Sequence, residues 1–314
     1  MPGRAQRLQL AAVLALILVP AASRTTRADP PEVGVRMRHV MMQMGYGASL
    51  RIDDLRGHLQ SRTANPPTFD DVNSYTVVMD YARTAVDGTS LTNLLNNYVF
   101  AAEDAPIKKL SVSVEGNELV QSGTLKKGVP IPFKMRASIA VTPDGRLRMH
   151  PTSLKAAGFV SKRVLDFFGL ELERMVSTKS TPGVAVDGDD LLLDPRQALP
   201  PPKIGGKLTN AWMEDGKLIM QFGAASAQAL EPPKSNAANY MYYRGGILKF
   251  GRLTMVDADL LLVDADPRDL FRFDPRKYQE QLVAGYSKTT RSGGLIVHMP
   301  DAGEAVTGRP GTTS

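Results

Sequence analysis

Apolar and polar residues alternate in three short segments between residues 110 and 149. The apolar positions are Leu110, Val112 and Val114, then Phe133, Met135, Ala137, Ile139 and Val141, then Leu147 and Met149. A period of two places these residues on one face of each strand, so the pattern predicts a sheet with one apolar face. From Phe159 to Val176 the apolar spacing changes to three and four residues, which predicts an amphipathic helix packed on that face.

Glycine-containing turns separate these segments and recur further along the chain. Asp144-Gly145 predicts a hairpin, because this pair tolerates positive φ. The segment 186–191 repeats the pattern of 114–119 at an offset of 72 residues, and 214–220 repeats 143–149 at an offset of 71. The matches indicate either a duplicated hairpin unit or the chance recurrence of short Gly-Asp turns. Under both interpretations the sequence predicts a long antiparallel β-meander.

The flanking regions add further strands and two helices. Alternation predicts strands at 33–41, 50–59, 75–81, 247–250, 253–263 and 295–297. Helical spacing predicts a short helix, capped by Thr89 or Ser90, whose apolar face consists of Leu91, Leu94, Leu95, Tyr98 and Val99. Asp274-Pro275 predicts the start of a second helix, which ends before Gly285.

The domain organisation follows from these elements. We expect an α+β fold in which residues 29–222 form a long, curved antiparallel meander wrapped on one or two amphipathic helices. Residues 223–239 contain few large apolar side chains and form a linker or a long loop. Residues 240–300 form a C-terminal β/helix extension packed on the same domain, and residues 301–314 form a disordered tail.

Residues 1–28 have the organisation of a Sec-type signal peptide. Arg4 and Arg7 precede an apolar run from Leu10 to Val19, and small residues around Ala28 offer a cleavage site. The alternative is an anchor that is never cleaved, although the run is shorter than the roughly 20 residues of a membrane span. We therefore expect a periplasmic or extracellular protein. Cleavage removes four arginines and no acidic residue, which lowers the net charge from +6 to +2 and argues against nucleic acid as a partner.

The sequence offers little catalytic or metal-binding chemistry. It contains no cysteine, which excludes disulfides, thiolate metal sites and cysteine nucleophiles. The segment 285–289 lacks the closing glycine of a hydrolase nucleophile elbow. The four histidines are scattered, and the acidic clusters at 187–194 and 257–266 lack the glycine and glutamate positions of an EF-hand. We expect no cofactor and no metal, and we identify no catalytic residue.

Several turn and strand sequences together resemble bacterial envelope proteins related to tubular lipid-binding (TULIP) domains. These sequences are Val112-Ser113-Val114-Glu115-Gly116, Asp144-Gly145-Arg146-Leu147, the segment from Val164 to Gly169, Gly183-Val184-Ala185-Val186-Asp187-Gly188, and Leu191 to Asp194-Pro195. The resemblance covers about residues 75–222 and consists of patterns of turns and alternation, and 240–300 has no counterpart in it. It implies a strongly curved sheet around a helix that encloses a groove for acyl chains.

The leading hypothesis is an exported, soluble protein of the cell envelope that binds or transfers a phospholipid or another acyl lipid and contacts the membrane peripherally. The predicted groove residues are Phe133, Met135, Ile139, Val141, Leu147, Met149, Phe167, Phe168 and Leu172. The predicted headgroup contacts, for which solvated surface is the alternative, are Lys126, Lys127, Arg146 and Arg148. About ten buried methylene groups, at roughly 0.8 kcal/mol each, would give micromolar affinity before entropic costs.

Two hypotheses from other classes stay open at this point. The first is a structural or interaction protein of the envelope with a filled core, whose 240–300 region binds a partner and exposes an apolar patch. The second is a weak hydrolase in which the fold brings together acidic or histidine side chains such as Asp257 and His150.

Overall fold

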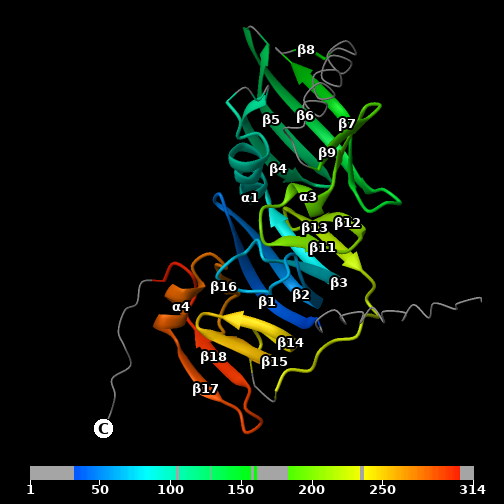
Figure 1. The fold of residues 1–314 in the computed structure, drawn as a ribbon. Helices are drawn as coiled ribbons and strands as arrows, with labels where there is room; N and C mark the ends of the chain where they lie inside the picture. The colour runs from blue at the N-terminus through cyan, green and yellow to red at the C-terminus, as the bar shows by residue number, and fades with distance from the viewer. Residues whose placement is uncertain are drawn as a thin grey trace, which may run out of the picture. The chain divides into compact units, whose positions relative to one another are not determined.

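Strands dominate the described part of the structure, in which the helices are short. The computed structural model describes residues 32–304 except 104, 106, 128, 157–158, 161–182 and 234–236. Within this part the strands form two sheets, in which most neighbouring strands are antiparallel (Figure 1). The predicted α+β class is therefore confirmed. The strands are divided between the two sheets and do not follow one continuous meander.

The large sheet combines strands from the two ends of the described chain. Its strands are β1 (Val33–Gly45), β2 (Ala48–Ser61), β3 (Tyr75–Asp87), β11 (Lys203–Gly205), β12 (Leu208–Glu214), β13 (Lys217–Gly223), β14 (Tyr240–Phe250), β15 (Leu253–Asp264), β16 (Phe271–Phe273), β17 (Tyr286–Thr289) and β18 (Leu295–Met299). They lie in the order β12-β13-β3-β2-β1-β14-β15-β18-β17, with β11 beside β3 and β16 beside β1. The antiparallel pairing of β1 with β14 joins the N-terminal strands directly to the 240–300 region.

The small sheet comes from the middle of the chain. Its strands are β4 (Ile107–Glu115), β5 (Glu118–Lys127), β6 (Val129–Val141), β7 (Leu147–Ala156), β8 (Phe159–Val160), β9 (Val184–Asp187) and β10 (Asp190–Leu193). They lie in the order β4-β5-β6-β7-β10-β9, with β8 beside β7. The alternation predicted for residues 110–149 is confirmed. Its apolar positions are buried or half-buried on one face, which we call the inner face.

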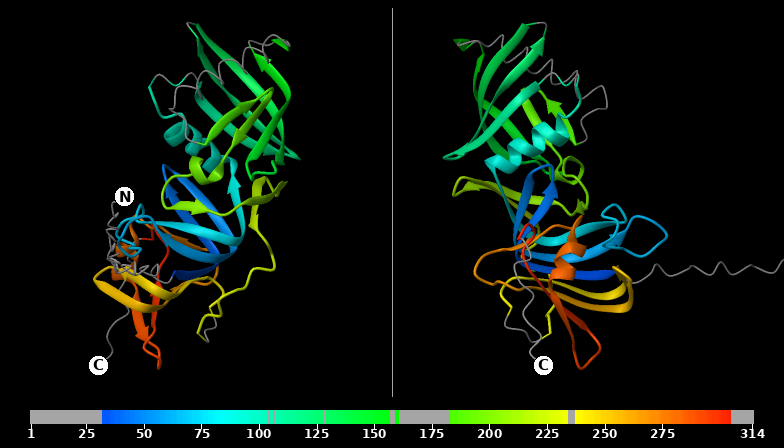
Figure 2. Two further views of the ribbon diagram at one scale, coloured as in Figure 1. Left: turned by 45° about the vertical axis from the view of Figure 1, so that its right-hand side comes forward. Right: turned by 90° about the vertical axis from the view of Figure 1, so that its left-hand side faces the viewer.

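A short helix lies along the small sheet (Figure 2). It consists of α1 (Gly88–Leu94) and the π-helical turn η1 (Leu95–Val99). Its N-cap is Asp87, whose carboxylate accepts a hydrogen bond from Ser90 N at 2.7 Å. The prediction of Thr89 or Ser90 as the cap was wrong. The reason is that Asp87 ends β3 in the extended conformation that an N-cap needs and carries an equally good acceptor.

The helix α1–η1 is attached to both sheets through side chains four residues apart. Asn96 Nδ2 donates to Leu110 O at 2.7 Å, and Leu110 N donates to Asn96 Oδ1 at 3.0 Å. Asn93 and Asn97 donate to the carbonyl oxygens of Gly47 and Tyr46, in the turn between β1 and β2. Thr92 Oγ1 also accepts a hydrogen bond from Val112 N of β4, at 2.8 Å. The i, i+4 spacing puts Thr92 and Asn96 on one side of the helix and Asn93 and Asn97 on another, so one element connects the edge of the small sheet to a turn of the large sheet.

In the described residues after 182, two further helices are present, α3 (Pro195–Ala198) and α4 (Tyr278–Ala284). The end predicted before Gly285 is confirmed, but α4 begins later than Asp274-Pro275. Asp274 instead forms a turn, in which its carboxylate accepts from Arg276 N and its carbonyl accepts from Lys277 N. Local turn formation by an aspartate competes with helix initiation at this position. Within the described residues, no helix combines the length and apolarity needed to cross a membrane.

The helix predicted over 159–176 can be compared with the structure only at its first two residues. Phe159 and Val160 form the strand β8, paired with β7, so the predicted helix start is wrong at these positions. The rest of that segment lies outside the described residues. The element that covers the inner face in the described part is α1–η1, which packs against β4.

Candidate functional site

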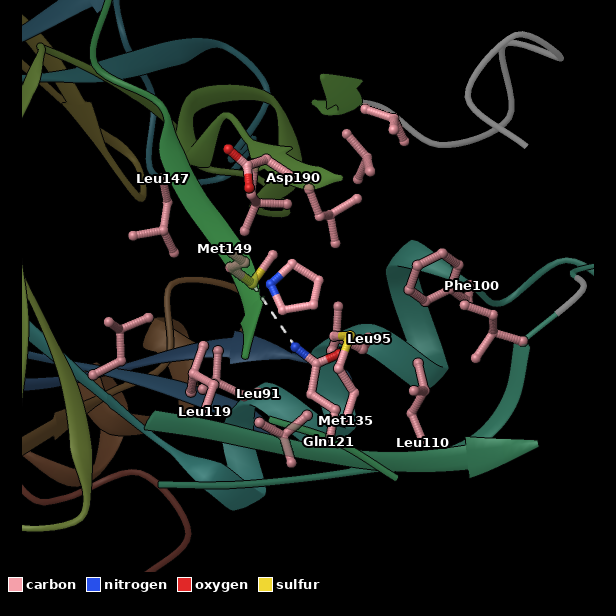
Figure 3. Close-up of a pocket in the computed structure, with 18 of the residues that line it drawn as sticks. Leu91, Leu95, Phe100, Leu110, Leu119, Gln121, Met135, Leu147, Met149 and Asp190 are labelled. Atoms are coloured by element: carbon pink, nitrogen blue, oxygen red, sulfur yellow. Dashed lines mark hydrogen bonds between the residues drawn. The ribbon is translucent and has the colours of Figure 1, made fainter. Parts of the chain in front are cut away.

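An apolar cavity of about 80 Å³ lies between the inner face of the small sheet and the helix α1–η1. In Figure 3, Leu91 and Leu95 approach it from the helix, while Met135 and Met149 approach it from the sheet. The lining residues in the described part are Leu91, Leu95, Phe100, Ile107, Leu110, Val112, Leu119, Gln121, Met135, Leu147, Met149, Pro151, Val184, Val186, Asp189, Asp190, Leu191, Leu193 and Leu218. Most of them are aliphatic, which makes the cavity a site for an apolar group.

Three of the predicted groove residues, Met135, Leu147 and Met149, line this cavity. Three others, Phe133, Ile139 and Val141, belong to the inner face but are not among its lining residues. Phe133 is buried, and Ile139 and Val141 are half-buried. The remaining predicted groove residues, Phe167, Phe168 and Leu172, lie outside the described residues.

The predicted headgroup residues do not form a cluster with one another in the described part. Arg146 Nε donates to Asp144 Oδ2 at 2.7 Å within its own hairpin turn. Arg148 Nε lies 3.4 Å from Asp190 Oδ2, and the alternation of β7 places Arg148 on the face opposite Met149. The side chains of Lys126 and Lys127 lie outside the described part.

Most of the cavity wall was not among the predicted groove residues, which supply only three of its nineteen described lining residues. Leu91 and Leu95 were recognised as the apolar face of a helix, but the spacing did not show which sheet that face would cover. Leu191 and Leu193 alternate on β10, a strand of four residues that is too short for a clear period-two signal. Leu119 lies beside a turn, and its register on β5 places it opposite Ala137. The strand pairing therefore determines that these leucines line the cavity, and the local sequence pattern does not reveal it.

Gln121 is the buried polar side chain among the described lining residues. It lies in the middle of β5, between Val112 of β4 and Met135 of β6, and is 8% exposed. The contact of its Nε2 is with Met149 Sδ, at 3.8 Å (Figure 3). A thioether sulfur is a weak acceptor, so this amide is poorly satisfied.

The opposite face of the small sheet carries a polar group. Asp190 Oδ1 lies 2.6 Å from His150 Nδ1, and Asp190 Oδ2 lies 3.4 Å from Arg148 Nε. A histidine oriented by a carboxylate is part of a hydrolytic triad, but in the described part no hydroxyl group is hydrogen-bonded to His150. Asp257, the other hydrolase candidate, lies 3.5 Å from Arg244 on a different sheet. The two candidate groups are therefore in separate ion-pair clusters.

An open groove of about 790 Å³ lies on the large sheet near the β14–β15 hairpin. Leu253 and Val256 line it and are 51% and 76% exposed. The polar part of its wall contains Arg244, whose Nη1 lies 3.1 Å from Asp259 Oδ2. This groove combines exposed apolar side chains with paired charges, as contact surfaces between proteins do.

Buried acids occur at the C-terminal end of the described chain. Asp264 and Asp301 are 4% and 3% exposed. Burial raises the pKa of the Asp264 carboxyl group. Burial, with a smaller contribution from the negative charges of Asp264 and Asp269, raises the pKa of Asp301 to about 6. Arg272 N donates to Asp301 at 2.7 Å. In the part of the chain that the structure covers, no group of three or more histidine, aspartate or glutamate side chains is placed to hold a metal ion.

No protein-family profile matches this chain, and no curated protein or solved structure matches it either.

Proposed function

We propose that the protein binds the acyl chain of a lipid in the cavity between the small sheet and α1–η1. The observation that carries this proposal is the cavity itself, because a well-packed core of this kind contains few voids larger than a water molecule. A water-sized group needs roughly 10–15 Å³, so the cavity has room for about five to eight such groups.

The cavity size sets the affinity that apolar burial alone can give. Five methylene groups at roughly 0.8 kcal/mol each contribute about 4 kcal/mol, which corresponds to a Kd of about 1 mM. Micromolar binding requires about ten groups and therefore a wider cavity. Met135 and Met149 supply that adaptability, because unbranched thioether side chains change rotamer at little cost. The proposal thus includes movement of these two side chains on binding.

Export and the TULIP resemblance belong to the same proposal. An exported lipid carrier would meet its ligand at the membrane surface and hold the chain away from water. The two sheets, the inner face and its covering helix support an apolar site of this kind. Wrapping of a curved sheet around an amphipathic helix, which the TULIP resemblance implies, belongs to the same proposal.

The test is saturable binding of 1-hexanol, an uncharged alkyl chain, to the full chain, followed by NMR through the methyl signals of Met135 and Met149. Leu191→Phe fills the cavity from β10 and should weaken binding at least tenfold. The matched control is Ile139→Phe. Leu191, Met149 and Ile139 form one row across β10, β7 and β6, and Ile139 is outside the cavity lining. Equal binding by both variants, or no saturable binding by the unmodified protein, would overturn the proposal.

A second candidate function is contact with a partner protein through the groove near the β14–β15 hairpin. Among the described residues, the exposed large hydrophobic side chains are Tyr46, Leu253, Val256, Val283 and Tyr286, and all but Tyr46 belong to the 240–300 region. Deleting that region is not a usable test, because β14 pairs with β1 inside the large sheet.

Point substitutions test this second candidate without breaking the sheet. Val256→Ser together with Leu253→Ser should abolish chemical cross-links to an envelope partner. Val283→Ser, which removes an even more exposed side chain outside the groove, should leave them unchanged. Cross-linking that survives the double substitution would exclude the groove as the contact surface.

A further inference from the structure

The Gln121 amide faces an apolar cavity and has no strong hydrogen-bond partner among the described residues. The residue is more than nine-tenths buried, its Nε2 contacts Met149 Sδ at 3.8 Å, and its neighbours across the sheet are Val112 and Met135. A purely structural position of this kind would be filled more stably by leucine or methionine, because a buried amide without a good partner destabilises the fold.

A bound water is a poor substitute for the missing partner. A buried water typically needs two to four polar partners. Of the other polar residues in the described lining, Asp189 is exposed to solvent, and the Asp190 carboxylate is paired with His150 and Arg148 on the opposite face of the sheet. Gln121 is therefore the polar side chain in the described lining that a molecule inside the cavity can contact. The amide therefore remains free to bond to an atom that enters the cavity together with apolar groups.

We infer that Gln121 recognises an oxygen atom of the ligand, and that the ligand is an apolar chain carrying a neutral oxygen function. A hydroxyl, an ester carbonyl or an un-ionised carboxyl fits this description, since each accepts a hydrogen bond from Nε2. An ionised carboxylate does not fit, because the described lining residues include no positively charged side chain to compensate its burial. This inference rests on the proposed function and specifies the chemistry of its ligand.

The structure also explains how the amide is held in place. Gln121 lies on β5, which pairs with β6 along its length and, at Gln121 itself, with Val112 of β4 on the other side. A central strand gives its side chain a fixed direction, and the inward alternation with Leu119 and Leu125 points it at the cavity. Recognition therefore comes from a rigid element of the sheet and needs no loop movement.

The experiment compares benzene with phenol, two soluble probes of nearly equal size that differ by one hydroxyl. Binding to the full chain is measured by NMR through the methyl signals of Met135 and Met149. The ratio of the benzene Kd to the phenol Kd should fall about tenfold in Gln121→Met, which corresponds to about 1.4 kcal/mol. Ile139→Val changes an inner-face residue outside the cavity lining, so it should retain the ratio of the unmodified protein.

Each result of this comparison decides something different. A tenfold fall confined to Gln121→Met supports the inference. An unchanged ratio, with both probes bound, overturns the role of Gln121 and leaves the apolar cavity as a ligand site. Failure of both probes to perturb the methionine methyl signals in the unmodified protein overturns the inference and the proposed function together. If Gln121→Met fails to fold, Gln121→Leu provides the same comparison.

Discussion

Asn96→Ala should destabilise the protein through the edge of the small sheet. Strand β4 contains an irregularity between Lys108 and Ser111, where its pairing with β5 is interrupted and Lys109 takes a φ of 53°. The Asn96 side chain replaces the missing partners by bonding to both backbone groups of Leu110, at 2.7 and 3.0 Å. It also donates to Thr92 O at 2.9 Å. Alanine removes all three bonds.

The expected loss follows from the number of bonds. A net contribution of about 1 kcal/mol for each hydrogen bond gives about 3 kcal/mol. Asn96 is half-buried, so water replaces part of it, and we expect a loss of about 2–3 kcal/mol in the free energy of unfolding. At roughly 2–4 °C per kcal/mol, Tm should fall by about 5–10 °C. Urea denaturation followed by the fluorescence of Trp212 and by circular dichroism measures the change.

Two variants test the reasoning behind this estimate. Asn97→Ala removes one exposed bond, to Tyr46 O at 3.1 Å, and should cost less than about 1 kcal/mol. Asn96→Asp keeps an acceptor for Leu110 N but places a carboxylate oxygen against two carbonyls, which raises its pKa in the folded state. The free energy of unfolding of Asn96→Asp should therefore fall further below that of the unmodified protein as pH rises from about 4 to 7. If Asn96→Ala costs no more than Asn97→Ala, or the Leu110 amide exchanges equally fast in both, the helix does not protect this edge.

Further substitutions test other parts of the fold. Asp301→Asn should stabilise the protein at pH 7.5 by about 1–3 kcal/mol and have little effect near pH 4, because the folded-state pKa of about 6 makes the unmodified protein lose stability as pH rises through that value. Gly223→Ala should cost more than about 3 kcal/mol, because its φ is +61° and a Cβ would lie 1.8 Å from Asp80 O. Gly116→Ala, at a φ of +60° with open space around it, should cost about 1 kcal/mol. Phe69→Ala should cost about 3–5 kcal/mol.

Each of these predictions has a measurement that can contradict it. For Asp301, a stability profile between pH 4 and 8 that is identical in Asp301→Asn would exclude the titration of this carboxyl as its cause. For the glycines, urea denaturation measures the loss of stability in each variant. Equal losses in Gly223→Ala and Gly116→Ala would mean that the positive φ causes the whole effect and that the close contact with Asp80 O adds nothing. For Phe69, whose ring centroid lies 5.2 Å from those of Tyr243 and Phe250, a loss below about 1 kcal/mol would show that the aromatic cluster repacks.

The sequence by itself determined the local elements and the faces of the small sheet. Phe133, Met135 and Ala137 share a face because side chains alternate along a strand wherever it is placed, so period two sufficed to predict their burial. Turns followed for the same reason. Asp144-Gly145 and Asp215-Gly216 carry their conformational preference within two residues, and both hairpins are present.

Only the tertiary structure decided which elements meet. The hairpin at 143–149 lies in the small sheet, while its sequence match at 214–220 lies in the large sheet, because pairing partners are chosen by long-range contacts that a local pattern does not encode. The same holds for the cavity. The spacing of Leu91 and Leu95 predicted an apolar helix face. The position of that face over the cavity depends on two long-range contacts, the hydrogen bonds of Asn96 to the irregular edge strand β4 and that of Asn93 to the β1–β2 turn. A cavity is what several elements leave unfilled between them, so no single stretch of sequence contains it.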